Sequence, residues 1–272
     1  MKPGGPRMDK PVYLAPDTNN TLVNRLLAPF FPRYRVLMEL EREPLHMRGP
    51  LRNLILSHDK RFLFLRNQKC ACTQTTQLLY AYGNLGETYP GNVHRADKGI
   101  YAARYRWPDI RPVFEAHMAY LFTFVRHPET RAHSAFRNFF VDQKNIARHK
   151  HMGPMKAHGY DPARGEDYNF DVFLDYVAHT FEIDRLRTDS HWRLQVDNVA
   201  WKDIRFDAVG RVESYEADIR RIFAEGGAPD FPPAHLLAER HNVSGAARTA
   251  VTPAQRARIE TLYAPDYEAF GY

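Results

Sequence analysis

The sequence has only two cysteines in 272 residues and lacks the features of several special protein classes. No apolar run approaches the roughly 20 residues of a membrane-spanning helix, and the amino end leads into no apolar segment typical of a secretory signal. Cys70 and Cys72 stand one residue apart, where extended side chains diverge, so we expect no disulfide between them. Two cysteines are also too few for an ordinary metal site. We therefore expect a cytoplasmic protein that uses no metal.

Runs of Lys and Arg are missing too, as are zinc-finger spacings and aromatic RNA-binding motifs, so we do not expect a nucleic-acid partner. The charge is nonetheless uneven. Residues 1–164 carry 26 Lys and Arg against 13 Asp and Glu, whereas residues 165–272 carry 12 against 19. Such an excess is either a solvated surface or a preference for an anionic ligand. Most of the basic residues are arginine, which suits phosphate and sulfate groups.

The composition that is present, 44% hydrophobic and 26% charged residues, is that of a folded domain. Four prolines among residues 1–20 predict an extended arm, and residues 21–44 show helical patches broken at Pro29 and Pro32. We treat residues 1–60 as an amino-terminal arm or appendage and residues 61–272 as the main domain.

Short apolar segments that precede helical patterns organise the main domain. Buried strands are predicted at residues 61–66, 120–125 and 206–212. Helices are predicted at 73–82, 129–140, 170–176 and 214–223, and another is predicted to open at Thr252-Pro253. Residues 84–118 carry loop signals, and residues 143–168 read as a loop or a broken helix. The alternation predicts an α/β fold with a mostly parallel sheet of about four or five strands, flanked by helices.

The segment after the first predicted strand has the chemistry of an anion site. Small residues lead there into a helix, whose first N–H groups and positive dipole end attract anions. Lys69 adds a positive charge, and the hydroxyls of Thr73 and Thr75 add donors. The glycine-containing P-loop pattern is absent, so the loop is P-loop-like in position only. The alternative is an ordinary helix start capped by Thr73.

The second strand ends in a similar junction. Arg126 closes the strand and Ser134 lies in the following helix, so a guanidinium and a hydroxyl are available to a phosphate. Ligands of open α/β sheets bind at the carboxyl ends of the strands, and both junctions satisfy that rule. We expect Arg131, in the same helix, to be an ordinary surface charge.

In order along residues 61–272, four segments resemble the carbohydrate sulfotransferases that use 3′-phosphoadenylyl sulfate (PAPS), the branch related to the chondroitin and HNK-type enzymes. The segment Phe124–Arg137 (FVRHPETRAHSAFR) carries the most specific likeness. The family often has Asp where His127 stands, and Gly or Ala within the first loop. The other segments are Lys69–Thr73 (KCACT), Phe206–Glu213 (FDAVGRVE), and the carboxyl end from His241-Asn242-Val243-Ser244 through Arg248 to Tyr272.

This resemblance implies a sheet like that of P-loop NTPases and an enzyme that transfers a sulfuryl group from PAPS to a hydroxyl of a carbohydrate or glycoconjugate. The product of the donor would be 3′,5′-ADP (PAP), and no metal is implied. Lys69 would stabilise the leaving phosphate. The implied donor-binding residues are Lys69, Ala71, Cys72, Thr73, Gln74 and Thr75 for the 5′-phosphosulfate, and Arg126, Ser134 and Arg248 for the 3′-phosphate.

The general base that accepts the proton of the acceptor hydroxyl is expected to be His94, because the family carries a histidine in a similar place. A histidine's ordinary pKa, close to neutral pH, suits that role. His191, His117 and Glu115 are the alternatives, in that order.

Two other interpretations stay open at the level of the sequence. One is a nucleotide-dependent small-molecule kinase, which would need a Mg²⁺-binding carboxylate and a conventional P-loop. The other is a non-catalytic protein that binds anions or nucleic acid. The sequence fixes neither the acceptor, nor the sulfated position, nor the role of residues 1–60, nor the oligomeric state, and it leaves contact with a membrane surface open.

Overall fold

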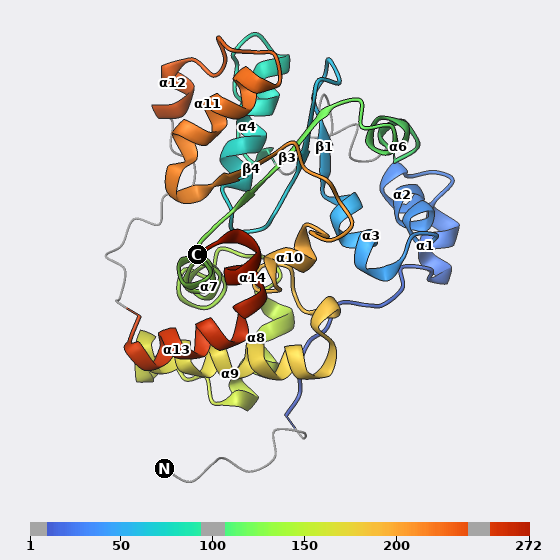
Figure 1. Ribbon diagram of the computed structural model, residues 1–272. Helices are drawn as coiled ribbons and strands as arrows, with labels where there is room; N and C mark the ends of the chain where they lie inside the picture. Colours follow the sequence, from blue (N-terminus) through green and yellow to red (C-terminus); the bar gives the residue numbers. More distant parts are fainter. Residues whose placement is uncertain (1–9, 94–106, 239–250) are drawn as a thin grey trace. The chain divides into compact units, whose positions relative to one another are not determined.

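The computed structural model of the chain describes residues 10–93, 107–238 and 251–272 (Figure 1). Internal contacts divide the chain into two compact units. We call them the sheet unit, Asp17–Arg126 with Gln195–Val243, and the helical unit, Met1–Pro16 with His127–Leu194 and Ser244–Tyr272.

The sheet unit is built on four strands in the order β1-β2-β3-β4. Their bounds are Leu54–Leu56, Phe62–Leu65, Tyr120–Val125 and Ala208–Arg211. β2, β3 and β4 are parallel, as predicted, and they occupy the three predicted strand segments. β1 was not predicted. It pairs antiparallel with β2 through a tight turn in which Ser57 N–H donates to the carbonyl oxygen of Phe62, so the sheet is mixed rather than wholly parallel.

Helices lie on both sides of this sheet, with α4, α11 and α12 on one side and α2, α3 and α6 on the other (Figure 1). The helices of the unit are α1 (Leu22–Leu27), α2 (Pro32–Leu40), α3 (Leu45–Arg52), α4 (Cys72–Gly83), α6 (Trp107–Glu115), α10 (Gln195–Asn198), α11 (Tyr215–Glu225) and α12 (Ala234–Ala238). α6 corrects the expectation of a loop over residues 84–118. Pro108 stands in its first turn, where no N–H donor is needed, and the buried face of Trp107, Ile110 and Val113 outweighs the internal Pro112.

Aromatic side chains from β2 and β3 form the core beneath α4 and α11. Phe62, Phe64, Phe122 and Phe124 are completely buried, and the rings of Phe64 and Phe122 stack with centroids 5.1 Å apart. Burial of each such ring contributes about 1.5–3 kcal/mol. This packing keeps β2 beside β3 in the Leu65↔Thr123 register, so the segments that leave their carboxyl ends start from neighbouring positions.

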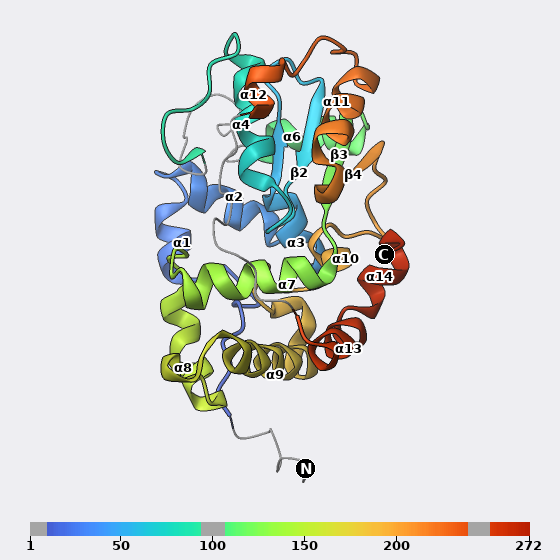
Figure 2. The same ribbon diagram turned by 90° about the vertical axis from the view of Figure 1, so that its left-hand side faces the viewer.

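The helical unit is arranged around the long helix α9 (Glu166–Asp184). In Figure 2, α7 (Pro128–Phe136) and α9 lie one above the other, with α8 (Arg148–His158) at one end and α13 (Pro253–Leu262) at the other. The remaining elements are the π-helical turn Arg137–Val141, the 3₁₀ turns Pro162–Arg164 and Arg185–Arg187, and α14 (Ala264–Phe270).

Two local expectations for this unit have clear outcomes. Thr252 caps α13 as predicted, in a capping box with Gln255. The expected loop or broken helix over residues 143–168 contains α8, an 11-residue helix that continues through Pro154 and buries His151, Met155 and His158. Across the described parts of the chain, no helix is both long and apolar enough to span a lipid bilayer.

Arg131 corrects another expectation. The side chain is not a surface charge but is 1% exposed, and it donates to the carbonyl oxygens of Arg193 and Ser190 at 2.9 Å each. A buried guanidinium needs several acceptors, and these carbonyls supply them. Arg131 therefore fixes the segment before Leu194 against α7.

Candidate active site

The two predicted anion-binding segments meet at one edge of the sheet. Lys69 follows the carboxyl end of β2, and Arg126 follows the carboxyl end of β3 directly alongside. The Arg126 guanidinium Nη1 donates to the backbone carbonyl oxygen of Lys69 at 3.3 Å. The sequence predicted that these two residues lie close together, and the structure confirms it.

The loop between β2 and α4 adopts an unusual backbone conformation. Lys69 (φ 67°) and Ala71 (φ 52°) both lie in the left-handed region, which residues other than glycine seldom occupy. Left-handed residues in a short loop turn successive N–H groups toward a common point, which is how proteins build concave anion sites. The loop thus adopts, without any glycine, a backbone conformation that usually requires glycine.

The start of α4 also suits an anion. Ala71 is the N-cap residue, and no side chain caps the helix, so the alternative in which Thr73 is the cap is wrong. A helix start without a side-chain cap has its positive dipole end available to a bound anion. Ala71, Cys72, Thr73 and Gln74 form this turn, and each is partly exposed.

Thr75 supports the loop from behind. Its N–H and its hydroxyl both donate to the carbonyl oxygen of Ala71, at 3.0 and 3.1 Å, and the Tyr215 hydroxyl lies 3.1 Å from the Thr75 hydroxyl. Burial raises the pKa of Tyr215. Because the single proton of the Thr75 hydroxyl goes to Ala71, the Tyr215 hydroxyl is the donor in its contact with Thr75. Because both Thr75 donors are engaged within the sheet unit, we place Thr75 behind the loop and no longer among the direct ligands.

Gln195, which was not predicted from the sequence, lies at the same edge of the sheet. Its side-chain oxygen accepts from Arg126 N–H at 2.9 Å and from the Cys70 thiol at 3.2 Å. Cys70 is buried, and both Cys70 and Cys72 are free thiols, as expected. Gln195 follows Arg126 by 69 positions, so no local pattern in the sequence signals the contact.

Two candidates for the general base lie at the wrong edge of the sheet. His117 and Glu115 precede β3, whereas Arg126 follows it, and the six residues of β3 span ~20 Å. Glu115 is engaged with Arg111 in an ion pair of 2.7 Å. We therefore exclude His117 and Glu115 as the base. His94 and Arg248 lie outside the residues that the structure describes.

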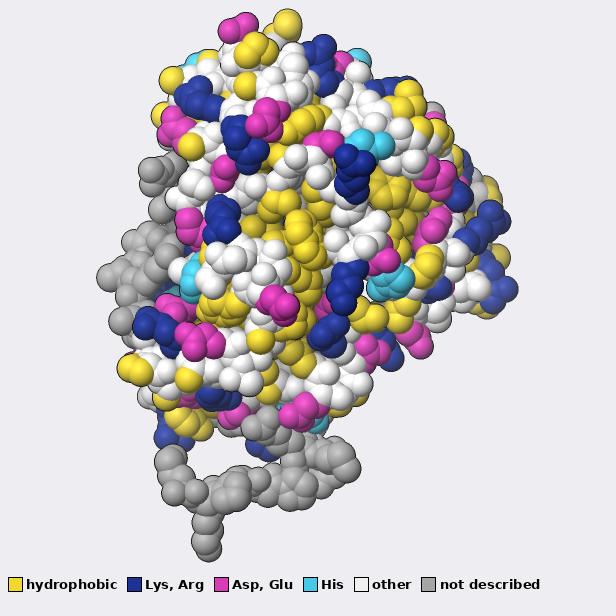
Figure 3. Space-filling model, viewed as in Figure 1, with side chains coloured by type: hydrophobic (Ala, Val, Ile, Leu, Met, Phe, Trp, Pro, Cys, Tyr) yellow, Lys and Arg dark blue, Asp and Glu magenta, His cyan; other side chains and the backbone are white. Residues whose placement is uncertain are grey.

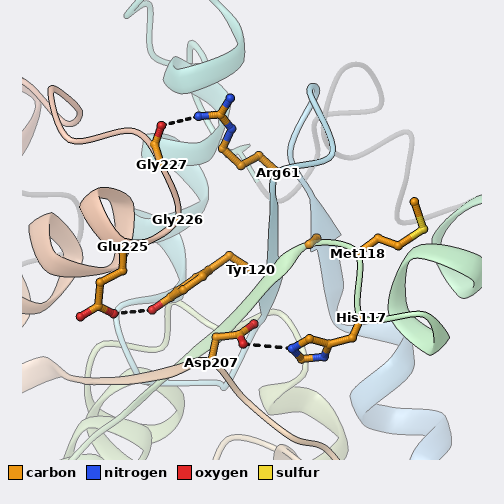
Figure 4. Close-up of a pocket in the computed structure, with 9 residues that line it drawn as sticks. Arg61, His117, Met118, Tyr120, Asp207, Glu225, Gly226 and Gly227 are labelled. Atoms are coloured by element: carbon orange, nitrogen blue, oxygen red, sulfur yellow. Dashed lines mark hydrogen bonds and ion pairs between the residues drawn. The ribbon is translucent and has the colours of Figure 1, made fainter.

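At that opposite edge, His117 lines a shallow pocket of about 420 Å³ (Figure 4). Its Nε2 lies 3.0 Å from Asp207 Oδ1, while Asp207 Oδ2 accepts from Leu121 N–H at 2.7 Å. The Tyr120 hydroxyl donates to Glu225, and burial together with that carboxylate raises the pKa of Tyr120. The polar groups of this pocket are thus hydrogen-bonded to one another.

Two other predicted residues belong to the helical unit. Ser134 is half-buried on α7. His191 Nδ1 lies 2.7 Å from Asp189 Oδ1, and buried His151 lies 3.1 Å from Asp189 Oδ2. Burial by itself would raise the pKa of Asp189, but the two histidines hold it well below its usual range. Asp189 therefore stays ionised and orients the His191 ring.

Residues 52–272 match the sequence profile of the sulfotransferase family. The chain belongs to the sulfotransferase family. The match covers most of the chain and includes both anion-binding segments, and it confirms the resemblance that the motifs indicated.

The curated relatives of this sulfotransferase-family chain are carbohydrate sulfotransferases. Carbohydrate sulfotransferase 11 of Rattus norvegicus is 25% identical over 198 residues, which cover 67% of this chain and 56% of the relative. Carbohydrate sulfotransferase 14 of Homo sapiens is 26% identical over 186 residues, covering 66% and 48%. The chain thus spans about half the length of the curated relatives it matches. No solved structure matches it significantly.

His127 has a packing role at the start of α7. Its ring packs edge-on against Tyr267 and Tyr272, with centroids 5.5 and 5.1 Å away. An aromatic side chain at this position therefore anchors the carboxyl-terminal helix beside the start of α7. Among the described residues, no group of three or more His, Cys, Asp and Glu is arranged to hold a metal ion.

Proposed function

We propose that this chain transfers a sulfuryl group from PAPS to a hydroxyl of a carbohydrate or glycoconjugate, leaving 3′,5′-ADP. The observation that carries the proposal is the contact between Arg126 and the Lys69 loop at the carboxyl ends of the parallel strands β2 and β3. PAPS has two anionic groups, a 5′-phosphosulfate and a 3′-phosphate, and two adjacent anion-binding segments match them. Membership of the sulfotransferase family and similarity to carbohydrate sulfotransferases support this choice of donor and acceptor.

On the donor side, the Lys69 loop and the start of α4 would hold the 5′-phosphosulfate through backbone N–H groups. In the reaction, the bond between sulfur and the bridging phosphate oxygen breaks, and a bond between sulfur and the acceptor oxygen forms. Negative charge grows on the bridging oxygen, and the Lys69 ammonium stabilises it there. Holding both reactants in line supplies much of the remaining rate enhancement.

The 3′-phosphate is assigned to Arg126, whose guanidinium makes strong charge-assisted hydrogen bonds with such groups. Ser134 and Arg248 are added to this set on the resemblance to the family. These residues recognise the donor and hold it in place, while the bond changes occur at its sulfate end.

The proton of the acceptor hydroxyl passes to a general base, for which we propose His94. His191 is the second candidate, because the hydrogen bond between its Nδ1 and Asp189 fixes the tautomer of the His191 ring. In that tautomer Nδ1 carries the proton, and Nε2 is the basic nitrogen. Asn145 Nδ2 lies 3.2 Å from Nε2, so an acceptor hydroxyl would have to replace that contact.

We propose that the acceptor is an acidic sugar, since the stretches 95–111 and 143–164 are rich in basic residues. The face seen in Figure 3 gives no support for a nucleic-acid ligand. On this face, the Lys and Arg side chains of the described residues are scattered among Asp and Glu and form no continuous basic strip. A backbone-binding surface for nucleic acid needs such a strip.

Ligand-induced thermal stabilisation separates the competing functions. We expect 3′,5′-ADP to raise the melting temperature, and ATP with Mg²⁺ or an oligonucleotide to leave it unchanged. Stabilisation by ATP with Mg²⁺ alone would favour the kinase, and stabilisation by the oligonucleotide alone would favour the nucleic-acid-binding protein. Transfer of labelled sulfate from PAPS to a panel of neutral and acidic glycans then identifies the acceptor.

A further inference from the structure

One side chain, the amide of Gln195, connects the two anion-binding segments. Gln195 is the first residue of the short helix α10 and is completely buried. Its Oε1 accepts from Arg126 N–H (2.9 Å) and from the Cys70 thiol (3.2 Å), and its Nε2 donates to the Arg126 carbonyl oxygen (2.8 Å). The same amide therefore binds both backbone polar groups of Arg126 and the centre of the Lys69 loop.

At Arg126, the side-chain amide of Gln195 occupies the place that a neighbouring strand would take. β3 pairs with β4 only as far as Val125↔Arg211, so Arg126 lies just beyond the parallel ladder. The Gln195 amide bonds the N–H and C=O of Arg126 as the peptide group of a neighbouring strand would. This fixes the backbone from which the Arg126 guanidinium extends.

On the loop side, Cys70 stands between the two left-handed residues Lys69 and Ala71. Holding its thiol therefore holds the centre of the strained loop. A neighbouring amide extends the network, because Asn67 Nδ2 donates to the Gln195 oxygen at 3.2 Å and to the Phe124 carbonyl oxygen at 3.1 Å. A satisfied buried polar network of this kind specifies one arrangement of the groups it joins.

We propose that Gln195 is a positioning residue that sets the Arg126 guanidinium and the Lys69 loop at the spacing required by a nucleotide with both a 5′-phosphate and a 3′-phosphate. The inference rests on the proposed function, since it assigns these segments to the two ends of one nucleotide. Gln195 does not touch the ligand. It determines how strongly the site prefers 3′,5′-ADP over 5′-AMP, which lacks the 3′-phosphate.

The test compares the affinities of 3′,5′-ADP and 5′-AMP in the full chain and in Gln195→Ala. We expect the preference for 3′,5′-ADP to fall about tenfold in the variant, as expected for hydrogen bonds that no longer hold Arg126 in place. In the background Arg126→Ala, Gln195→Ala should change the preference little, because the group that it positions has been removed. Thr123→Val is the control: it removes a buried 2.8 Å hydrogen bond to the Leu65 carbonyl oxygen between β2 and β3 but contacts neither segment.

A role confined to packing predicts a different result. In that case Gln195→Ala would lower stability as Thr123→Val does and leave the nucleotide preference intact, which would overturn the inference while the proposed function stands. Effects of Gln195→Ala and Arg126→Ala that simply add would overturn it too. A parent chain without any preference for 3′,5′-ADP would contradict the inference and the proposed function together.

Gln195→Glu provides an independent readout, which decides the matter if Gln195→Ala does not fold. The carboxylate keeps an acceptor for Arg126 N–H but loses the donor and adds negative charge beside the anion site. The quantity measured is again the preference for 3′,5′-ADP over 5′-AMP, which should fall in Gln195→Glu and recover toward the parent's value as acidification protonates the carboxylate and restores a donor. An unchanged preference in Gln195→Glu at neutral pH would contradict the positioning role.

Discussion

The guanidinium of Arg126 reaches the backbone carbonyl oxygen of Lys69, although 57 positions separate the two residues along the chain. This contact places the positive charge of Arg126 beside a loop whose backbone is itself suited to attract anions. If the proposed donor site is right, the strength of 3′,5′-ADP binding depends on Arg126.

Arg126→Ala should weaken 3′,5′-ADP binding by about 1.5–3 kcal/mol, the range for charge-assisted hydrogen bonds, whereas Ser134→Ala should cost nearer 1 kcal/mol. Isothermal titration calorimetry measures both values. Arg25→Ala, which removes an exposed arginine of α1, is the charge control and should bind normally. Unchanged affinity in Arg126→Ala would refute its assignment to the 3′-phosphate.

Lys69→Ala should lower turnover and also loosen the donor, because the ground-state phosphosulfate is already anionic. The larger loss should be in kcat, since charge on the bridging oxygen grows in the transition state. Steady-state kinetics with varied PAPS separate the two effects. An increase in KM with unchanged kcat would mean that Lys69 binds the donor without assisting its departure.

His94→Ala should reduce turnover by ~10²–10⁴-fold while 3′,5′-ADP binds normally, because a base touches only the acceptor. The parent's pH–rate profile should fall on the acid side as the histidine protonates. His117→Ala, at the opposite edge of the sheet, is the matched control and should retain full turnover. Loss of turnover in His191→Ala with normal turnover in His94→Ala would move the base to His191 without changing the reaction.

Asp189→Asn should destabilise the chain at neutral pH by about 1–3 kcal/mol, because it removes the partly buried carboxylate that hydrogen-bonds both His151 and His191. The folded-state pKa of Asp189 is lowered, so its contribution is complete above the unfolded-state value near pH 4 and is lost as the pH falls further. The difference between parent and variant should therefore shrink below about pH 4.

Chemical denaturation across pH 3–7 measures this difference. Asp171→Asn is the control for removal of a carboxylate, since Asp171 pairs with Arg258 at the surface and should contribute less than about 1 kcal/mol. A variant Asp189→Asn as stable as the control at neutral pH would show that the ionised Asp189 does not stabilise the fold.

The sequence predicted the parallel part of the sheet well, because apolar runs such as residues 120–125 have few other ways to bury their side chains. It predicted α6 and α8 poorly, since prolines inside them argue for loops and only tertiary burial overrides that argument. β1 was not predicted, because a strand of three residues is too short to show a periodic pattern.

For the site, the sequence predicted that Lys69 and Arg126 lie together, but it did not reveal the residues that support them. Lys69 and Arg126 were predictable, since each follows a recognisable strand. Gln195 and the buried Arg131 were not, because their roles depend on contacts with segments about 60 or more positions away. Burial of Arg131 also depends on carbonyl acceptors that no property of its own helix reveals.

Because Lys69 and Ala71 adopt left-handed conformations without being glycine, the Lys69 loop loses its conformational entropy on folding rather than on ligand binding. A glycine-rich loop samples many conformations until a ligand selects one, so much of the ordering takes place during binding. Lys69 and Ala71 have fewer conformations open to them, and folding already holds them in a costly one. The conformational entropy is therefore lost before any anion arrives, and calorimetry should find a smaller entropic penalty for nucleotide binding here than in Ala71→Gly.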